Sequence, residues 1–149
     1  MKKHSFNYHY VHLLPNEQLG MHFQEDWEVN YIVNGVGKLV YGEEHVWFAS
    51  GDVFFIPFGV TNCFLFNDEV TNEDGEVLNI CLHIEDEFLK RLANNFPEFA
   101  EDIRRICAIR EPVKYDAAHS VPLIDKLEIM VDMTDAERIP YVIELLSLL

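Results

Sequence analysis

The chain has 149 residues, and 49% of them are hydrophobic, so it is long enough and apolar enough to fold around one substantial core. Its formal charge of -15 at pH 7 repels a phosphate backbone and argues against nucleic-acid binding by this segment. The start of the chain lacks the apolar run of a secretion signal, and no apolar run approaches a membrane span. We therefore expect a cytoplasmic protein with no membrane partner.

Residues 1–84 consist of short segments with strand-like patterns, separated by turn residues. Several of them are rich in β-branched and aromatic residues, and the segment WEVNYIV is the clearest. The dipeptide Asn34-Gly35 predicts a tight hairpin between WEVNYIV and the return strand KLVY. Many short strands with glycine between them predict a β-sandwich or barrel. The expected strands are FNYHYVHLL, LGMHFQ, WEVNYIV, KLVY, HVWFA, VFFIP, CFLF and VLNICLHI.

Residues 85–149 change to a helical pattern. Pro97 is suited to the first turn of a helix over PEFAEDIRRICAIR, which follows a first helix over EDEFLKRLANNF. Ser120 is expected to cap a third helix, and Thr134 with Glu137 predicts a capping box for a fourth. The three cysteines, Cys63, Cys81 and Cys107, are widely spaced among apolar neighbours, so we expect reduced, buried thiols.

The last predicted helix carries a broad apolar stripe. The chain stops inside this stripe with no cap, so we expect the natural protein to continue past Leu149. An apolar stripe that is exposed on a monomer marks an interface, and a symmetric dimer through these helices would bury it. The alternative is that the stripe packs wholly within the chain. The predicted dimerisation residues are Ile139, Val142, Ile143, Leu146 and Leu149.

Two segments resemble the two motifs of the cupin family. The first is marked by Gly20, His22, Gln24, Glu28 and Gly35, and the second is GDVFFIPFGVTN, residues 51–62. This resemblance covers residues 4–84 and implies a double-stranded β-helix, which is a jelly-roll barrel.

The last strand and the helices after it resemble one branch of that family in particular, the N-terminal half of AraC-type transcription regulators. The resemblance implies a cupin sensor barrel over 1–84 that binds a small-molecule effector. It implies barrel-packing and dimerisation helices over 85–149, which form a homodimer. DNA would be bound only by a separate helix-turn-helix domain, which is missing after Leu149.

The cupin resemblance also places the positions that hold a metal in catalytic cupins. Those enzymes use two histidines and a glutamate from the first motif and a third histidine from the second. Here the positions are His22, Gln24, Glu28 and Asn62. Amide oxygens are poor ligands for transition metals. We therefore expect no tightly bound metal and no cofactor, with His22 and Glu28 as the remaining candidate ligands.

The same polar side chains, pointing into a barrel, need hydrogen-bond partners. A sugar-like, polyol or amide-bearing ligand would supply them, and ordered water is the alternative. In VLNICLHI, period-two alternation places Leu78, Ile80, Leu82 and Ile84 toward the helices. It places Asn79, Cys81 and His83 toward the barrel interior.

The family resemblance adds Phe64 to Asn79 and Cys81 as effector-contacting positions. Their types differ from those of arabinose-binding members, so arabinose is not the expected effector. Trp47 is a candidate flat wall for a sugar ring, and plain sheet packing is its alternative. The predicted ligand-binding residues are His22, Gln24, Glu28, Trp47, Asn62, Phe64, Asn79, Cys81 and His83.

We therefore predict a non-enzymatic sensing and dimerisation domain that binds a small polar effector, most simply a carbohydrate. The alternative function is a stand-alone metal-dependent cupin enzyme, such as an isomerase or a dioxygenase, since fold alone does not fix function. A third possibility is a carbohydrate-binding module without a regulatory role. The sequence carries no G-x-S-x-G, H-E-x-x-H or phosphate-binding glycine loop that would indicate other chemistry.

Overall fold

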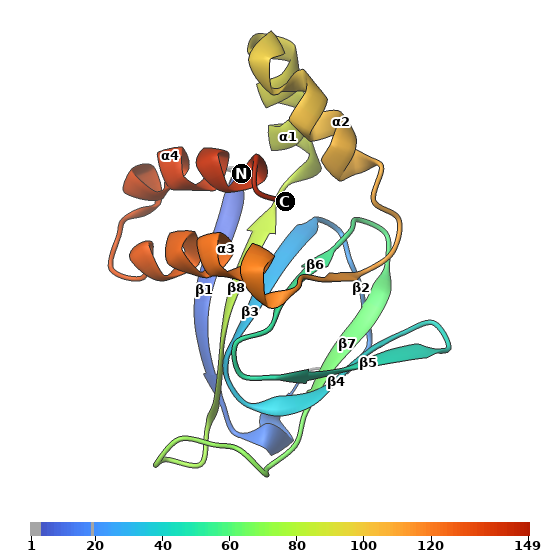
Figure 1. The fold of residues 1–149 in the computed structure, drawn as a ribbon, viewed down its shortest axis with the longest axis vertical. Helices are drawn as coiled ribbons and strands as arrows, with labels where there is room; N and C mark the ends of the chain where they lie inside the picture. Colours follow the sequence, from blue (N-terminus) through green and yellow to red (C-terminus); the bar gives the residue numbers. More distant parts are fainter. Residues whose placement is uncertain (1–3, 19) are drawn as a thin grey trace.

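A computed structural model describes residues 4–18 and 20–149, and these form two facing antiparallel sheets with helices on one side (Figure 1). The first residues of the chain and Leu19 of the expected strand LGMHFQ lie outside the described part. The five-stranded sheet has the order β1 (Phe6–Leu13), β8 (Val77–Ile84), β3 (Trp27–Asn34), β6 (Val53–Ile56), β9 (Val113–Lys114). The four-stranded sheet has the order β2 (His22–Phe23), β7 (Thr61–Phe66), β4 (Val36–Tyr41), β5 (Glu44–Ala49). The predicted fold class, a mainly β barrel followed by α-helices, is confirmed.

The five-stranded sheet uses its two faces for different purposes. Along β8, Ile80, Leu82 and Ile84 are fully buried in a core shared with the helices, as the alternation predicted. A second, smaller core fills part of the space between the two sheets and is rich in phenylalanine, and the Phe48 ring makes edge-to-face contacts with Phe54 and Phe66. This inner core draws on β3 to β8, and a cavity lies beside it on the side of β1, β2 and β8.

The hairpin predicted at Asn34-Gly35 is wrong, because β3 and β4 belong to different sheets. β3 pairs with β6 and β8, whereas β4 pairs with β5 and β7. Gly35 is needed for a close approach rather than for a turn, since a Cβ atom there would lie 2.7 Å from the ring of Phe66. Its amide also donates to the Ser50 hydroxyl at 2.9 Å, which fixes the crossover between the sheets.

The four predicted helices form, but the second and the third begin at residues other than those expected. They are α1 (Asp86–Asn95), α2 (Ala100–Cys107), α3 (Ala117–Ile129) and α4 (Asp135–Leu146), with short 3₁₀ turns η1 (Pro15–Glu17) and η2 (Pro97–Phe99). The capping box of Thr134 and Glu137 is confirmed. The cap predicted at Ser120 is wrong, because α3 begins earlier and Asp116 accepts a 2.7 Å bond from the amide of His119.

The Asp116 cap gives a first testable prediction. Asp116→Ala leaves the His119 amide without its acceptor, so we expect the free energy of unfolding to fall by about 1 kcal/mol. The measurement is urea denaturation followed by circular dichroism. Asp125→Ala, an exposed acidic position within the same helix, is the matched control and should leave the midpoint nearly unchanged. Equal losses in the two variants would contradict the assignment of the cap.

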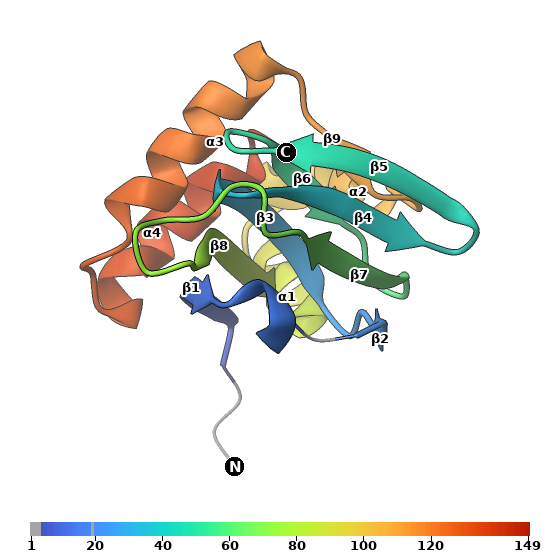
Figure 2. The ribbon, with the colours of Figure 1, turned by 90° about the horizontal axis from the view of Figure 1, so that it is seen from below.

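The apolar stripe of α4 packs mostly within the chain. Val142, Leu146 and Leu149 are buried in the core shared with the five-stranded sheet, and Ile143 is partly buried against it. Figure 2 shows α3 and α4 side by side on the side of the molecule away from β4, β5 and β7. Val142, Leu146 and Leu149 therefore pack within the chain, and a dimer through these helices stays a prediction. Ile139, with 42% of its surface exposed, is the most exposed member of the stripe.

Backbone hydrogen bonds, as well as side-chain packing, connect the helical segment to the barrel. The short strand β9, which the sequence pattern did not indicate, lies between α2 and α3 and pairs with β6 through Phe54 and Phe55. The division of the chain into a sensor barrel and a dimerisation segment stays a prediction. In the described residues, no helix is both long and apolar enough to cross a membrane.

Candidate ligand-binding cavity

A cavity of about 360 Å³ lies between the two sheets on the side of β1, β2 and β8. Its volume falls in the range of small-molecule sites. The apolar part of its wall consists of Val11 and Leu13 of β1 and Phe64 and Phe66 of β7. The polar part includes Glu28, Asn30, Asn79, Cys81 and His83, with Gln18 and the exposed His9 and His22 completing the lining.

Strand pairing explains why the polar groups meet. In the register of β3 with β8, Glu28 lies opposite His83 and Asn30 lies opposite Cys81. On the other side of β8, His9 of β1 lies opposite Cys81. Directly opposed residues share one face of a sheet, so these side chains all face the space between the sheets.

The buried polar groups of this wall bind one another. The amide of Asn30 donates to Glu28 Oε2 at 2.8 Å and to Cys81 Sγ at 3.3 Å. The amide of Asn79 donates to Asn30 Oδ1 at 3.2 Å and to Cys81 Sγ at 2.9 Å. Glu28 is only 3% exposed, so this network and His83 largely replace water around its carboxylate.

His83 and Cys81 have shifted acidities for identifiable reasons. Burial alone lowers the pKa of His83, but the Nδ1 hydrogen bond to Asp26 at 2.9 Å and the charges of Glu28 and Asp26 outweigh it. The pKa of His83 is therefore raised, and the ring takes up a proton more readily than a free histidine. Burial raises the pKa of the Cys81 thiol well above its ordinary value, and the charge of Glu28 adds to this shift.

Three of the four predicted motif positions lie together, because His22 pairs with Asn62 between β2 and β7 and Asn62 is hydrogen-bonded to Gln24. His22 is exposed and lines the cavity, whereas Gln24 and Asn62 are buried beside it and do not line it. Asn62 donates to the amide oxygen of Gln24 at 3.2 Å, while in the described structure Asn62 Oδ1 has no hydrogen-bond partner. The histidine that meets Glu28 is His83 and not His22.

Trp47 lies outside the barrel, and its prediction as a cavity wall is wrong. Its side chain is 62% exposed, with the ammonium of Lys38 5.8 Å from the ring centroid. The alternation of β5 explains this, because Phe48 next to it points into the inner core and so turns Trp47 outward. Phe64, Asn79 and Cys81, the positions implied by the family resemblance, all line the cavity.

The sequence reasoning missed several lining residues. Asn30 shares strand parity with Glu28, and Val11 shares it with His9, so period-two alternation along WEVNYIV and FNYHYVHLL could have indicated both. Gln18 follows η1 in a loop, where no periodicity applies, and it reaches the wall by donating to the Phe66 carbonyl at 2.7 Å.

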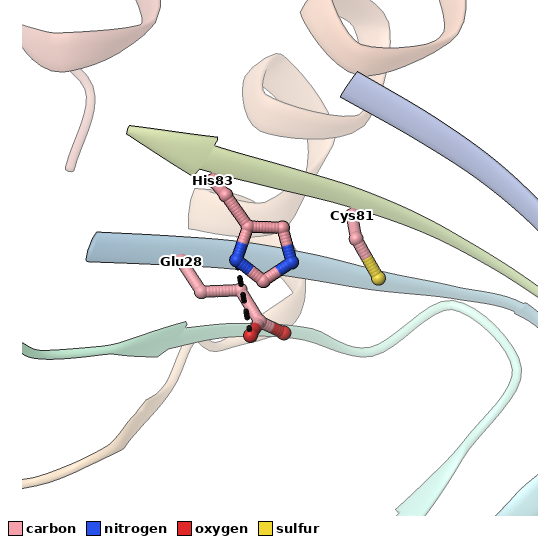
Figure 3. Close-up of side chains that lie close together, drawn as sticks. All are labelled: Glu28, Cys81 and His83. Atoms are coloured by element: carbon pink, nitrogen blue, oxygen red, sulfur yellow. Dashed lines mark ion pairs between the residues drawn. The ribbon is translucent and has the colours of Figure 1, made fainter. Parts of the chain in front are cut away.

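Among the lining residues, three potential metal ligands lie together. The ligand atoms of Glu28, Cys81 and His83 are all within 4.8 Å of one another, and the described residues contain no other such group. Figure 3 shows the three side chains projecting to the same side of β3 and β8. Of the two predicted metal candidates, Glu28 belongs to this group and His22 does not.

No protein-family profile matches the chain, and no curated protein matches it by sequence. Its fold is similar to that of ToxT from Vibrio cholerae. A ToxT structure with a bound unsaturated fatty acid has a TM-score of 0.56 at 13% identity, over 99% of this chain and 53% of that one. A second, bound to (E)-4-(8-methylnaphthalen-1-yl)but-3-enoic acid, has a TM-score of 0.54 at 11% identity, over 95% and 54%.

The AraC-like transcriptional activator CuxR has a similar fold as well. Its TM-score is 0.50 at 14% identity, over 84% of this chain and 41% of that chain. The chain therefore spans about half the length of the ToxT structures and less than half that of CuxR. At these identities the similarity concerns the fold.

Proposed function

We propose that this chain is the effector-binding domain of an AraC-type transcription regulator. The observation that carries the proposal is the cavity between the sheets, whose lining combines buried amides and carboxylate with aromatic side chains. The fold likeness to ToxT, including structures with a bound fatty acid or a bound butenoic acid derivative, and to the AraC-like CuxR supports it. The role is binding rather than catalysis.

The effector that suits this lining is small and not anionic, with hydroxyl or amide groups for the polar wall and an apolar face for the larger, apolar part of the lining. Glu28 brings a buried carboxylate, and the described lining contains no lysine or arginine that would pair with a ligand carboxylate. A free fatty acid is therefore a poorer match here than a hydroxyl-bearing or amide-bearing molecule. A sugar matches both the polar and the apolar parts of the lining. Its hydroxyls would bind Asn30 and Asn79, and its apolar face would pack on Phe64.

Strand β8 provides a physical route from the effector to the helices. Asn79 and Cys81 face the cavity, while Ile80 and Leu82 between and beside them pack against the helical layer. A ligand that shifts β8 changes the support of α3 and α4, and differential affinity for two such arrangements is what allostery requires. A homodimer through the C-terminal helices, with Ile139 at its contact, and DNA binding by a following domain belong to the same proposal.

Blocking the cavity tests the binding role. Val11→Phe places a ring into the cavity from β1, and we expect it to abolish ligand binding while the barrel stays folded. The measurement is a thermal-shift screen of wild type and variant against neutral monosaccharides and polyols, alkyl amides and fatty acids. A neutral polar compound should raise the melting temperature of wild type. At concentrations above the dissociation constant, the stabilisation should grow with the logarithm of the ligand concentration.

The matched control is His12→Phe, which adds the same ring one residue away on the same strand, on the opposite face. It should bind the ligand as wild type does. Loss of binding in His12→Phe alone, or stabilisation of Val11→Phe equal to that of wild type, would place the ligand elsewhere. Stabilisation by fatty acids alone would contradict the proposed ligand class.

The regulatory part of the proposal is tested by the natural reading frame past Leu149. We expect it to continue for about a hundred residues with two helix-turn-helix patterns and a basic surface. A stop codon directly after Leu149 would contradict the regulator and favour a stand-alone binding module.

A further inference from the structure

We propose that Glu28, Cys81 and His83 form a binding site for a divalent transition-metal ion of the zinc class at the wall of the cavity. The site uses two side chains of β8 and one of β3, and it differs from the ligand set that the cupin motifs would supply. It goes beyond effector binding and stands whether or not the cavity also takes an organic ligand.

The chemistry of the three ligands suits such an ion. A cysteine sulfur, an imidazole nitrogen and a carboxylate oxygen are the three donor types found in protein zinc sites. Around a tetrahedral zinc, bonds of 2.0–2.3 Å put the ligand atoms about 3.3–3.8 Å apart. One ligand atom of each residue lies within 4.8 Å of the others, so the side chains must rotate to bring the three to these distances. The fourth position faces the cavity and is open to water or to a ligand.

The surroundings orient His83 as a metal ligand. Its Nδ1 donates to Asp26 at 2.9 Å, because an ionised carboxylate only accepts. The lone pair of a neutral ring is then on Nε2, and Figure 3 shows that nitrogen on the side of Cys81. A carboxylate that holds the far nitrogen of a metal-binding histidine is a recurrent second contact in zinc sites.

The asparagines prepare the other two ligands. Asn30 and Asn79 both donate to the sulfur of Cys81, at 3.3 and 2.9 Å, and such donors compensate the negative charge of a thiolate. Asn30 also holds one oxygen of Glu28 at 2.8 Å. The other oxygen lies 3.8 Å from Nδ1 of His83, so the Glu28 carboxylate must turn toward Nε2 to share an ion with it. Metal binding releases the thiol proton of Cys81 to solvent, and the dication then balances the thiolate and the carboxylate.

The experiment is a Co²⁺ titration of the chelator-treated full chain, followed by absorption spectroscopy. A cobalt–thiolate bond gives a charge-transfer band, and a tetrahedral site gives intense visible bands. We expect both to saturate at one Co²⁺ per chain and to disappear on addition of Zn²⁺. Cys81→Ser should abolish the charge-transfer band, and Asp26→Asn should weaken Zn²⁺ binding 10- to 100-fold.

Matched variants separate this site from other possibilities. Cys107→Ser removes a partly exposed thiol on α2 and should leave the spectrum unchanged. A circular dichroism melt confirms that each variant is folded, and His83→Ala provides a second test if Cys81→Ser is not. A folded wild type with no cobalt–thiolate band, or a band lost in Cys107→Ser and kept in Cys81→Ser, overturns the proposal. Organic-ligand binding that persists in the presence of chelator would leave the effector proposal standing in either case.

Discussion

Replacing Leu146 with glutamate is expected to unfold the domain rather than to produce a folded monomer. Leu146 is 1% exposed and belongs to the core that α4 shares with the five-stranded sheet. Removing a buried leucine side chain costs about 2–5 kcal/mol, and burying an unpaired carboxylate adds to this. Typical domains are stable by about 5–15 kcal/mol, so the loss is comparable with the total. The measurement is chemical denaturation at neutral pH, where the variant should show little or no folded baseline.

The matched control on the same helix is Ile139→Glu. Ile139 is 42% exposed, so the new charge stays in water and the denaturation midpoint should change little. If the helices form a dimer through this side, Ile139→Glu should also lower the mass measured by light scattering at constant fold. A stable, folded Leu146→Glu protein would show that α4 is not part of the core.

The contrast between Leu146 and Ile139 shows that a periodic pattern predicts a helix and its apolar side, but not what that side packs against. Both belong to one apolar stripe, and the sequence correctly places them on one helix. The pattern does not say whether the stripe faces another helix, a sheet or a second chain. Only the long-range packing of α3 and α4 on the five-stranded sheet decides that, and no local signal encodes it.

The cavity wall shows the same limit at the level of side chains. Alternation along β8 correctly places Asn79, Cys81 and His83 toward the interior, because period two is a local property of a strand. The motif correctly drew attention to Glu28, but the histidine that meets it comes from β8, more than fifty residues away in sequence. That meeting depends on the pairing of β3 with β8, two strands far apart in sequence, which a local pattern does not specify.

Gly37→Ala is expected to have the second large effect. It tests the pairing of β4 with β7, the strand that carries Phe64 and Phe66 of the cavity lining. A Cβ atom at Gly37 would lie 2.0 Å from the backbone oxygen of Leu65 and 2.8 Å from the ring of Phe48. The backbone oxygen is fixed by the β4–β7 ladder, so the two strands must separate to admit even a methyl group. We expect a loss of about 3 kcal/mol or more in the free energy of unfolding.

Separation of β4 and β7 should also disturb the cavity, because β7 carries two of its apolar lining residues. Gly37 pairs with Phe66, and Phe64 lies two residues further along the same strand. Ligand binding in Gly37→Ala should therefore weaken along with stability, as measured by calorimetric titration at a temperature where the variant remains folded. Gly20→Ala is the control, since a Cβ atom there meets nothing within 4 Å and should change neither quantity. Equal stability of the two alanine variants would mean that β4 and β7 are not packed as closely as the backbone contact at Gly37 requires.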